Sequence, residues 1–390
     1  MLKLVQSAFY KEDEAREALA RFVLSGNQLS YGPECRKFEE SFAKWQGAKY
    51  AIMFSSGSTA NFALVQALTH TKHLKKGDKV GFSGVTWPTN VLPLIQLGLT
   101  PVPVDVNLKT LNISPETLKK TLKKHKLKGL FLTHVLGLVD NLKEIVDICE
   151  KNKIALIEDT CEALGTVYKG KKLGNFGLGG TFSFFIGHHM STIEGGMVVT
   201  NNSEIAQELK IIRSHGWDRH LEPHEQKSLR DKHKVDDFYA LYTFYNLGNN
   251  FRPTEISGFL GSLQLKHADT IVKKREENFE KLAQAIYKRN DLYYPIDTKH
   301  IDTVSNFAFP LIPRSKEIQE KLRERAKDLV EIRPLIAGNI TKQPFYKLHG
   351  IIHEPLENAD IIHHHGLYFG NNPDLTAKDI ETLIEIFTDL

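Results

Sequence analysis

The sequence contains few cysteines. Its 390 residues include only Cys35, Cys149 and Cys161, and no two of them have the CxxC spacing. An odd number without paired spacing argues against a disulfide framework and against a tetrathiolate metal or iron–sulfur site. The sequence therefore fits a protein of the reducing cytoplasm.

Long apolar runs and concentrated positive charge are also missing. No apolar stretch reaches the length of a membrane span, and residues 1–10 lack the basic start and apolar stretch of a signal peptide. The net charge is only +4, and the lysines are spread along the chain instead of forming a basic stripe or tail. We therefore expect a cytoplasmic protein that binds neither a membrane nor nucleic acid.

The order of apolar segments predicts an α/β fold. Hydrophobic residues make up 41% of the chain, which is enough for a large core. Short apolar runs alternate with helical patterns, and the predicted strands are 50–54, 79–82, 100–104, 129–133 and 154–158. This alternation is typical of a mostly parallel sheet covered by helices. We predict a large domain over residues 1–260, including the N-terminal segment, and a smaller α+β domain over residues 261–390.

Ser55-Ser56-Gly57-Ser58-Thr59 follows the first predicted strand and begins a helical pattern. Free backbone N–H groups and the positive end of the helix dipole make such a helix start a phosphate site. The same residues also cap ordinary helices, so this segment alone leaves both interpretations open.

Two further segments follow predicted strands. Asp159 ends an apolar strand, where a carboxylate can point into a ligand crevice and pair with a protonated pyridine nitrogen. Trp87 lies in a loop after another strand, where an indole can stack on a planar ring. Taken singly, Asp159 could be a helix N-cap and Trp87 a buried core residue.

In order and spacing, ten segments together resemble the DegT/DnrJ/EryC1/StrS family of pyridoxal phosphate (PLP)-dependent nucleotide-sugar enzymes. They are Ser55–Ala60, Gly77–Val80, Val85–Thr89, Pro103–Asp105, Ile157–Glu162, Leu173–Gly177, Phe182–Phe184, Glu194–Thr200, Arg213–Asp218 and Leu247–Arg252. The resemblance covers nearly the whole chain. It implies the fold type I architecture of PLP-dependent transferases.

The resemblance also implies how PLP is held. Gly57 and Ser58, together with Ser183, are expected at the phosphate, and Trp87 is expected to stack on the pyridine ring. Asp159 is expected at the ring nitrogen.

Two further cofactor residues are implied in the same way. Glu162 is expected near the ring hydroxyl, although many relatives carry glutamine there. Asn250 is expected to reach the phosphate in the neighbouring subunit. The second role implies a homodimer with shared active sites.

The main departure from the family pattern is His188, at the position where aminotransferases of the family carry the lysine that binds PLP covalently. No lysine lies between Lys172 and Lys210, so none is available to replace it. Imidazole cannot form that bond. The cofactor, as PLP or pyridoxamine phosphate (PMP), would therefore be held non-covalently.

The run Gly187-His188-His189 resembles the branch of the family that deoxygenates sugars at C3. That resemblance implies L-glutamate as the amino donor, His188 as the catalytic acid/base with a near-neutral pKa, and GDP-4-keto-6-deoxy-D-mannose as the nucleotide-sugar substrate. The product would be a 4-keto-3,6-dideoxy sugar for a surface polysaccharide.

Several alternatives were weighed. A GDP-linked 4-keto-6-deoxyheptose is an alternative substrate, because it would present the same C3 and C4 to the enzyme. A related dehydrase of CDP-sugars is excluded, because it needs an iron–sulfur cluster that three scattered cysteines cannot bind. A catalytically inactive binding or regulatory protein of this fold is the alternative from another class. The doublet His188-His189 is a poor metal site because adjacent residues rarely ligate one ion, so no metal is expected.

Four residues are candidates for contacts with the substrate. His215 and Arg219 lie in a segment that runs beside the active site in relatives, and Arg219 could contact a pyrophosphate or simply belong to a solvated loop. Glu331 and Arg333 match a substrate-side stretch of the C-terminal domain.

Overall fold

The computed structural model describes residues 1–26 and 28–390, and its centre is a seven-stranded sheet. The spatial order is β1-β9-β8-β5-β4-β2-β3. The strands are β1 (Tyr50–Phe54), β2 (Lys79–Ser83), β3 (Thr100–Val104), β4 (Gly129–Thr133), β5 (Ala155–Asp159), β8 (Gly180–Ser183) and β9 (Gly196–Thr200). Only β9 is antiparallel to its neighbours, so the prediction of a mostly parallel sheet is confirmed.

Both faces of this sheet are buried. Successive side chains of a strand point to opposite faces. In β1, Ile52 and Phe54 belong to one apolar cluster, whereas Met53 belongs to another. In β4, Phe131 lies in the first cluster and Leu130 in a third. Strands buried on both sides read as continuous apolar runs, which is why they were recognisable in the sequence.

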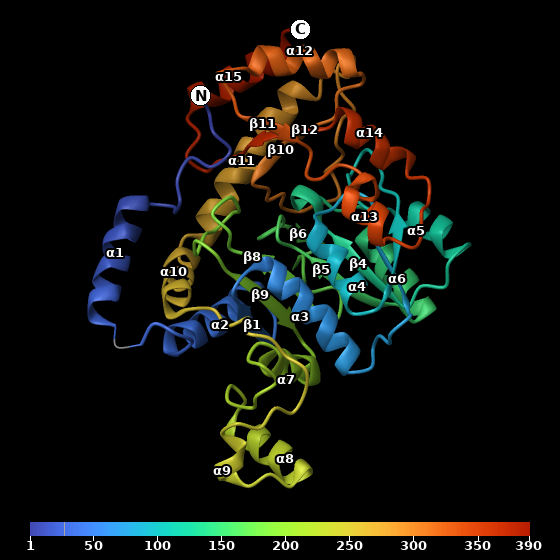
Figure 1. The fold of residues 1–390 in the computed structure, drawn as a ribbon. Helices are drawn as coiled ribbons and strands as arrows, with labels where there is room; N and C mark the ends of the chain where they lie inside the picture. The colour runs from blue at the N-terminus through green and yellow to red at the C-terminus, as the bar shows by residue number, and fades with distance from the viewer. Residues whose placement is uncertain (27) are drawn as a thin grey trace.

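Helices supply the covering layers (Figure 1). α3 (Gly57–His70), α4 (Leu92–Gln96) and α7 (Ser203–Ile212) pack on the face that carries Phe54. The opposite face is covered by α2 (Pro33–Gln46) near β1, and by α5 (Pro115–Leu122) and α6 (Leu142–Asn152) near β3 and β5. α1 (Glu12–Ser25) and α2 both pack against α10 (Glu255–Leu265).

A second, three-stranded antiparallel sheet lies in the C-terminal part. Its order is β10-β12-β11, with β10 (Ala308–Leu311), β11 (Ile332–Pro334) and β12 (Leu367–Gly370). The long helix α11 (Ala268–Ile286) leads to it, and the remaining helices are α12 (Lys316–Ala326), α13 (Pro344–His349), α14 (Glu357–His365) and α15 (Ala377–Thr388). This small sheet matches the predicted fold class, while the proposed boundary at residue 260 stays a prediction.

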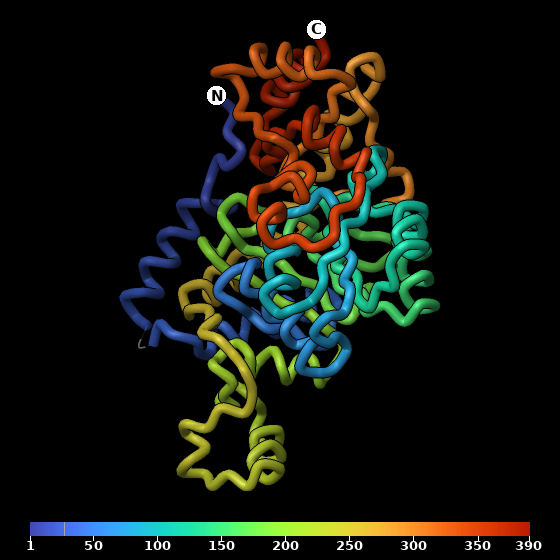
Figure 2. The backbone as a smooth tube through the Cα atoms, turned by 45° about the vertical axis from the view of Figure 1, so that its right-hand side comes forward, coloured from blue at the N-terminus to red at the C-terminus, as the bar shows by residue number. Residues whose placement is uncertain are grey.

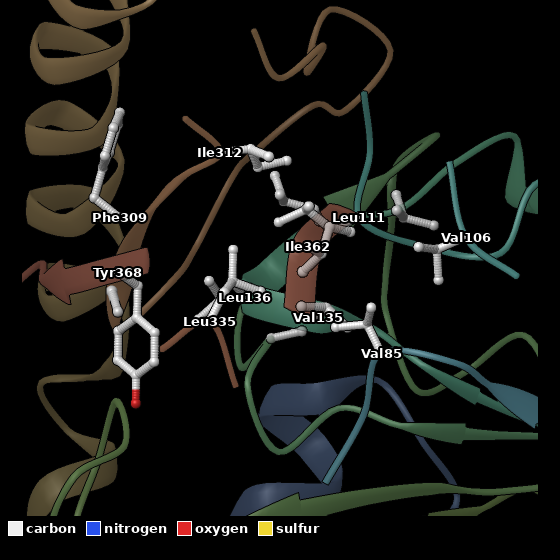
Figure 3. Packing of buried hydrophobic residues seen from close by; sticks show 14 of the residues in the cluster. Val85, Val106, Leu111, Val135, Leu136, Phe309, Ile312, Leu335, Ile362 and Tyr368 are labelled. Atoms are coloured by element: carbon white, nitrogen blue, oxygen red, sulfur yellow. The ribbon is translucent and has the colours of Figure 1, made fainter. Parts of the chain in front are cut away.

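One apolar cluster joins the two sheets (Figure 3). Val135 and Leu136 lie in the short helix η2 (Val135–Gly137) after β4, and they share this cluster with Leu335 and Ile362 of the C-terminal part. The N-terminal segment before α1 also contacts the C-terminal part, because the Leu2 amide donates to the Leu329 carbonyl at 2.7 Å. The C-terminal sheet is thereby held next to the carboxyl ends of β4 and β5.

Smaller elements complete the structure. The hairpin of β6 (Val167–Tyr168) and β7 (Lys171–Lys172), and the short helices η1 (Pro88–Asn90) and η3 (Ile340–Lys342), connect larger elements. Residues 217–248, with α8 (Pro223–His233) and α9 (Asp237–Ala240), form an arm that projects beyond α7 (Figures 1 and 2). Over the described ranges, no helix combines the length and apolar character required of a membrane span.

Candidate active site

The start of α3 presents free amides. Ser56 is the N-cap, and its hydroxyl accepts a hydrogen bond from the Thr59 amide at 3.1 Å while the Thr59 hydroxyl accepts from the Ser56 amide at 3.0 Å. The amides of Gly57 and Ser58 belong to the first turn, where a helix offers no acceptor of its own. They remain available for an anion at the positive end of the helix dipole.

Ser183 lies directly beside this helix start. A Cβ placed on Gly57 would come within 2.6 Å of the Ser183 Cβ, so only glycine allows this approach. The structure therefore brings Ser183 next to Gly57 at the start of α3, while the role of these residues in binding a phosphate stays a prediction.

Asp159 is held by two hydrogen bonds at the end of β5. One carboxylate oxygen accepts from the Asn61 side chain at 3.0 Å and the other accepts from the Cys161 amide at 2.9 Å. Asn61 also donates to the Thr89 hydroxyl at 3.1 Å and accepts from the Thr181 hydroxyl at 2.5 Å. The fully buried Asn61 thus links α3, the Trp87 loop and β8 to Asp159, and nothing in its sequence context singled it out.

Trp87 is 54% exposed, which excludes a core role. The residue before it is anchored, because the buried Thr86 hydroxyl lies 2.7 Å from the Thr133 hydroxyl and donates to the Asn90 side chain at 3.0 Å. An indole on an anchored loop with an open face suits stacking on a planar ring.

Glu162 is buried near Asp159. Its carboxyl accepts from the Leu136 amide at 2.9 Å. Burial, with a further contribution from the Asp159 charge, raises the pKa of Glu162 to about 8. The side chain is therefore protonated at neutral pH and can donate a hydrogen bond as glutamine does.

His188 is packed among aromatic rings in the loop between β8 and β9. Its ring lies 5.2 Å from the Phe307 ring at an interplanar angle of 28°, and its backbone amide donates to the Phe185 carbonyl at 2.9 Å. Burial lowers the pKa of His188 to about 4, so the expectation of a near-neutral pKa was wrong. The imidazole is a neutral base at pH 7, and its Nδ1 has no partner within the part of the chain that the structure describes.

Glu331 and Arg333 approach this region from the small sheet. The Glu331 carboxylate accepts from the Leu4 amide at 2.9 Å and from the Arg333 guanidinium at 2.5 Å. Arg333 also interacts with Tyr368, whose pKa is raised first by burial and then by the charge of Glu162. Tyr368 thus connects the predicted substrate residues of the C-terminal part to the cofactor residues.

The other three predicted residues lie at the base of the arm. His215 is exposed with a φ of 58°, and the Arg219 guanidinium lies 4.0 Å from the centre of the Trp217 ring and donates to the Leu241 carbonyl at 2.7 Å. Asn250 is exposed and its side chain accepts from the Arg252 amide at 3.4 Å. None of the three forms a hydrogen bond with the cofactor residues of its own chain among those described.

The buried pair of His134 and Glu158, next to Asp159 in β5, was not predicted from the sequence. The fully buried Glu158 accepts hydrogen bonds from His134 at 2.8 Å and from the amides of Gly174, Phe176 and Gly177 at 2.9, 2.6 and 2.8 Å. It fixes the loop after β7 to the end of β5. Its charge gave a possible signal, since an acid inside an apolar strand needs partners.

Comparisons with known proteins agree with this geometry. The family model "DegT/DnrJ/EryC1/StrS aminotransferase family" matches residues 10–388. The chain is 35% identical over 381 residues to GDP-4-keto-6-deoxy-D-mannose 3-dehydratase of Escherichia coli O55:H7, covering 96% of this chain and 97% of the relative. It is 34% identical over 388 residues to the enzyme of the same name from Yersinia pseudotuberculosis, covering 96% and 95%.

A solved structure extends the likeness to the whole fold. The crystal structure of GDP-4-keto-6-deoxymannose-3-dehydratase with a trapped PLP–glutamate geminal diamine has a TM-score of 0.90 and 33% identity, and it covers 100% of both chains. The fold is therefore PLP fold type I. With a family model matched over almost its entire length and full-length relatives above 30% identity, this chain belongs to the DegT/DnrJ/EryC1/StrS aminotransferase family, a PLP-dependent family that includes nucleotide-sugar aminotransferases and 3-dehydratases.

Proposed function

We propose that this protein removes the C3 hydroxyl of a nucleotide-linked 4-keto-6-deoxy sugar, with PLP and PMP bound non-covalently and L-glutamate as amino donor. The observation that carries the proposal is His188, a buried neutral base where aminotransferases of the family carry lysine, with no lysine between Lys172 and Lys210. GDP-4-keto-6-deoxy-D-mannose is the favoured substrate because the two full-length relatives at 34% and 35% identity are named for it.

The residues present fit this cofactor. The Ser183 side chain approaches Gly57 so closely that a Cβ at position 57 would clash with it, which supports a phosphate site formed by the Gly57 and Ser58 amides and the Ser183 hydroxyl. The Asp159 carboxylate suits a protonated pyridine nitrogen, and the open face of Trp87 suits the ring.

When bound, the cofactor supplies an amine for the C4 ketone and an electron sink for the elimination. His188 acts as the acid/base: its neutral imidazole accepts a proton and then, as imidazolium, delivers it to the departing oxygen on C3. Protonated Glu162 would donate a hydrogen bond to the hydroxyl group of the cofactor's pyridine ring, and because it stays neutral it adds no second negative charge beside Asp159. Arg333 and Glu331 orient the sugar from the small sheet.

The homodimer with shared active sites is part of the proposal. Asn250 is exposed beside the arm, which places it where a neighbouring subunit can accept its side chain. His215 and Arg219 also lie at the base of the arm. They would then contact the substrate bound by the neighbouring subunit instead of the substrate bound by their own chain.

The test is product analysis by mass spectrometry after incubation of the purified protein with PLP, L-glutamate and GDP-4-keto-6-deoxy-D-mannose. We expect a product that has lost one oxygen, strict dependence on glutamate, and loss of product in His188→Ala. The matched control is His349→Ala, which removes an exposed histidine of α13 and should leave turnover intact.

Other outcomes separate the alternatives. A 4-amino sugar would contradict the dehydratase and establish transamination without the lysine. Turnover only of the corresponding GDP-heptose would change the substrate and keep the chemistry. Failure to bind PLP, seen as an unchanged absorption spectrum, would favour a catalytically inactive binding protein.

A further inference from the structure

A small cavity lies behind His188, on the side of α11. It has a volume of about 30 Å³ and is lined by His188, His189, Arg275, Phe307, Ser191 and the N-terminal residues that precede α1. A volume of about 15 Å³ already admits one water molecule, so this cavity can hold a ligand of a few atoms.

The polar atoms around the cavity are unusual because they lack well-aligned partners. Within the described ranges, neither ring nitrogen of His189 forms a well-aligned hydrogen bond, although the Ser305 backbone lies near enough to interact with this buried histidine. Nδ1 of His188 likewise lacks a well-aligned bond but lies near the Ser183 backbone, whereas Nε of Arg275, a side chain that is 6% exposed, has no partner among the described residues. A buried polar group without a partner is costly, so a ligand that bonds to the Arg275 guanidinium and the neighbouring imidazoles at once would be stabilised there.

The charge around the cavity is uncompensated. Arg275 donates only to neutral carbonyl oxygens, those of Asn306 and Asn371. Burial lowers the pKa of Arg275 to about 9, which still leaves it a cation at neutral pH. Among the described residues, Asp374 is the acid whose charge acts on Arg275, and it forms an ion pair with Lys274 at 3.8 Å.

No carboxylate supplies the missing charge from the cavity wall. None of the described lining residues is an aspartate or a glutamate, whereas imidazole N–H groups, the guanidinium and the Ser191 hydroxyl can all donate. A buried cation without a counter-charge is costly, and water compensates it less well than an anion does. Donors on several sides around a cation define an anion site.

We propose that the cavity between His188, His189 and Arg275 binds a small monovalent anion, either a halide ion or the carboxylate group of an amino acid. An anion there would face Nδ1 of His188 and stabilise the imidazolium that protonates the leaving oxygen. The carboxylate source rests on the proposed function, because L-glutamate is the amino acid that function requires, and the halide source does not.

Bromide is the probe for the site, because its anomalous scattering locates it directly. We expect crystals of the full-length protein soaked in sodium bromide to show an anomalous peak inside the cavity, next to the Arg275 guanidinium. The peak should disappear in Arg275→Gln and persist in Lys274→Gln, a matched variant one position away that removes a half-exposed cation. Absence of a peak from the cavity of the wild-type crystals, with bromide only on the surface or water in its place, would overturn the proposal.

Two further arms complete the experiment. If Arg275→Gln does not fold, His189→Asn removes a different donor and should also weaken the peak. Soaking with L-glutamate together with bromide distinguishes the sources: loss of the peak assigns the site to a carboxylate, and an unchanged peak assigns it to a halide. Neither result depends on turnover, so failure of the dehydratase assay leaves the anion site to stand or fall on its own.

Discussion

At the scale of single residues, burial sets the protonation of two titratable groups in the proposed site, His188 and Glu162. It lowers the pKa of His188 to about 4 and raises the pKa of Glu162 to about 8. At neutral pH the histidine is therefore a free base and the glutamic acid carries a proton. The neutral histidine can then accept a proton in the proposed reaction, and the protonated glutamic acid can donate a hydrogen bond.

Glu162→Gln tests this protonation by way of stability. The unfolded carboxyl ionises near 4.5 and the folded one near 8, so folding takes up a proton between these values. The contribution of Glu162 to the free energy of unfolding is thus fully present below pH 4.5 and falls by about 1.4 kcal/mol for each pH unit up to about 8. Glutamine cannot ionise and should remove that loss.

Urea unfolding of the cofactor-free protein at about pH 5 and about pH 8 measures the effect. Relative to wild type, the variant should gain on the order of 3 kcal/mol between the two conditions. The control Glu357→Gln changes an exposed carboxyl and should gain nothing. Parallel pH profiles for wild type and Glu162→Gln would show that Glu162 is ionised in the folded protein.

His188→Lys should restore covalent attachment of the cofactor. A lysine amine at this position would form the bond with PLP that imidazole cannot form, and borohydride reduction would make the bond permanent. Intact-protein mass spectrometry should then show a cofactor adduct on the variant and none on wild type. An adduct on wild type, or none on the variant despite bound PLP, would place the reacting carbon away from residue 188.

At the scale of elements, the start of α3 combines a helix cap with the proposed phosphate site. Ser56 caps the helix and Ser114 caps α5 with the same reciprocal Ser/Thr hydrogen bonds. Replacing either serine with alanine should cost about 1 kcal/mol of stability. Only Ser56→Ala should also weaken PLP binding, because only α3 presents its first turn to the phosphate.

Denaturant unfolding and fluorescence titration with PLP measure the two effects on both variants. Equal stability losses with a weaker affinity confined to Ser56→Ala are the expected results. Unchanged PLP affinity in Ser56→Ala would remove the α3 terminus from the phosphate site.

The arm of residues 217–248 exposes several large hydrophobic side chains. Phe238, Tyr239 and Leu247 are 73%, 70% and 75% exposed, which is costly for side chains of this size unless another chain covers them. We expect the double variant Phe238→Ser, Tyr239→Ser to dissociate the proposed homodimer in analytical ultracentrifugation. Lys232→Ser, on exposed α8 of the same arm, should leave the mass unchanged. A monomeric wild type, or a double variant that remains dimeric, would contradict the role of the arm.

The elements differed in how far the sequence predicted them. The bounds of β1, β3 and β4 were predicted to the residue, because apolar runs bounded by turn residues mark strands buried on both faces. The arm was not predicted, because α8 buries none of its residues and so has no apolar stripe to reveal it. Its exposed aromatic residues suit the proposed contact with a second copy of the chain.

At the scale of the whole molecule, the active site is assembled from distant segments. Motifs next to strand ends indicated Asp159 and the start of α3, because parallel strands present their carboxyl ends at one edge, whereas Ser183 was expected from the family resemblance. Phe307 and Arg275 reach His188 only through the packing of the C-terminal part on the sheet, and no local pattern encodes that packing. The family resemblance predicted that His188 is an acid/base. The structure showed that burial keeps its imidazole neutral at pH 7.

In the proposed deoxygenation, the amino nitrogen of L-glutamate is released as ammonia and does not remain in the sugar product. L-Glutamate labelled with heavy nitrogen, supplied with PLP and GDP-4-keto-6-deoxy-D-mannose, tests it most directly. The proposed deoxygenation predicts that the label is released as ammonia in step with 2-oxoglutarate, and that the sugar product contains no nitrogen on its ring. Label retained on C4 of the sugar would contradict it and make this chain an aminotransferase that works without its lysine.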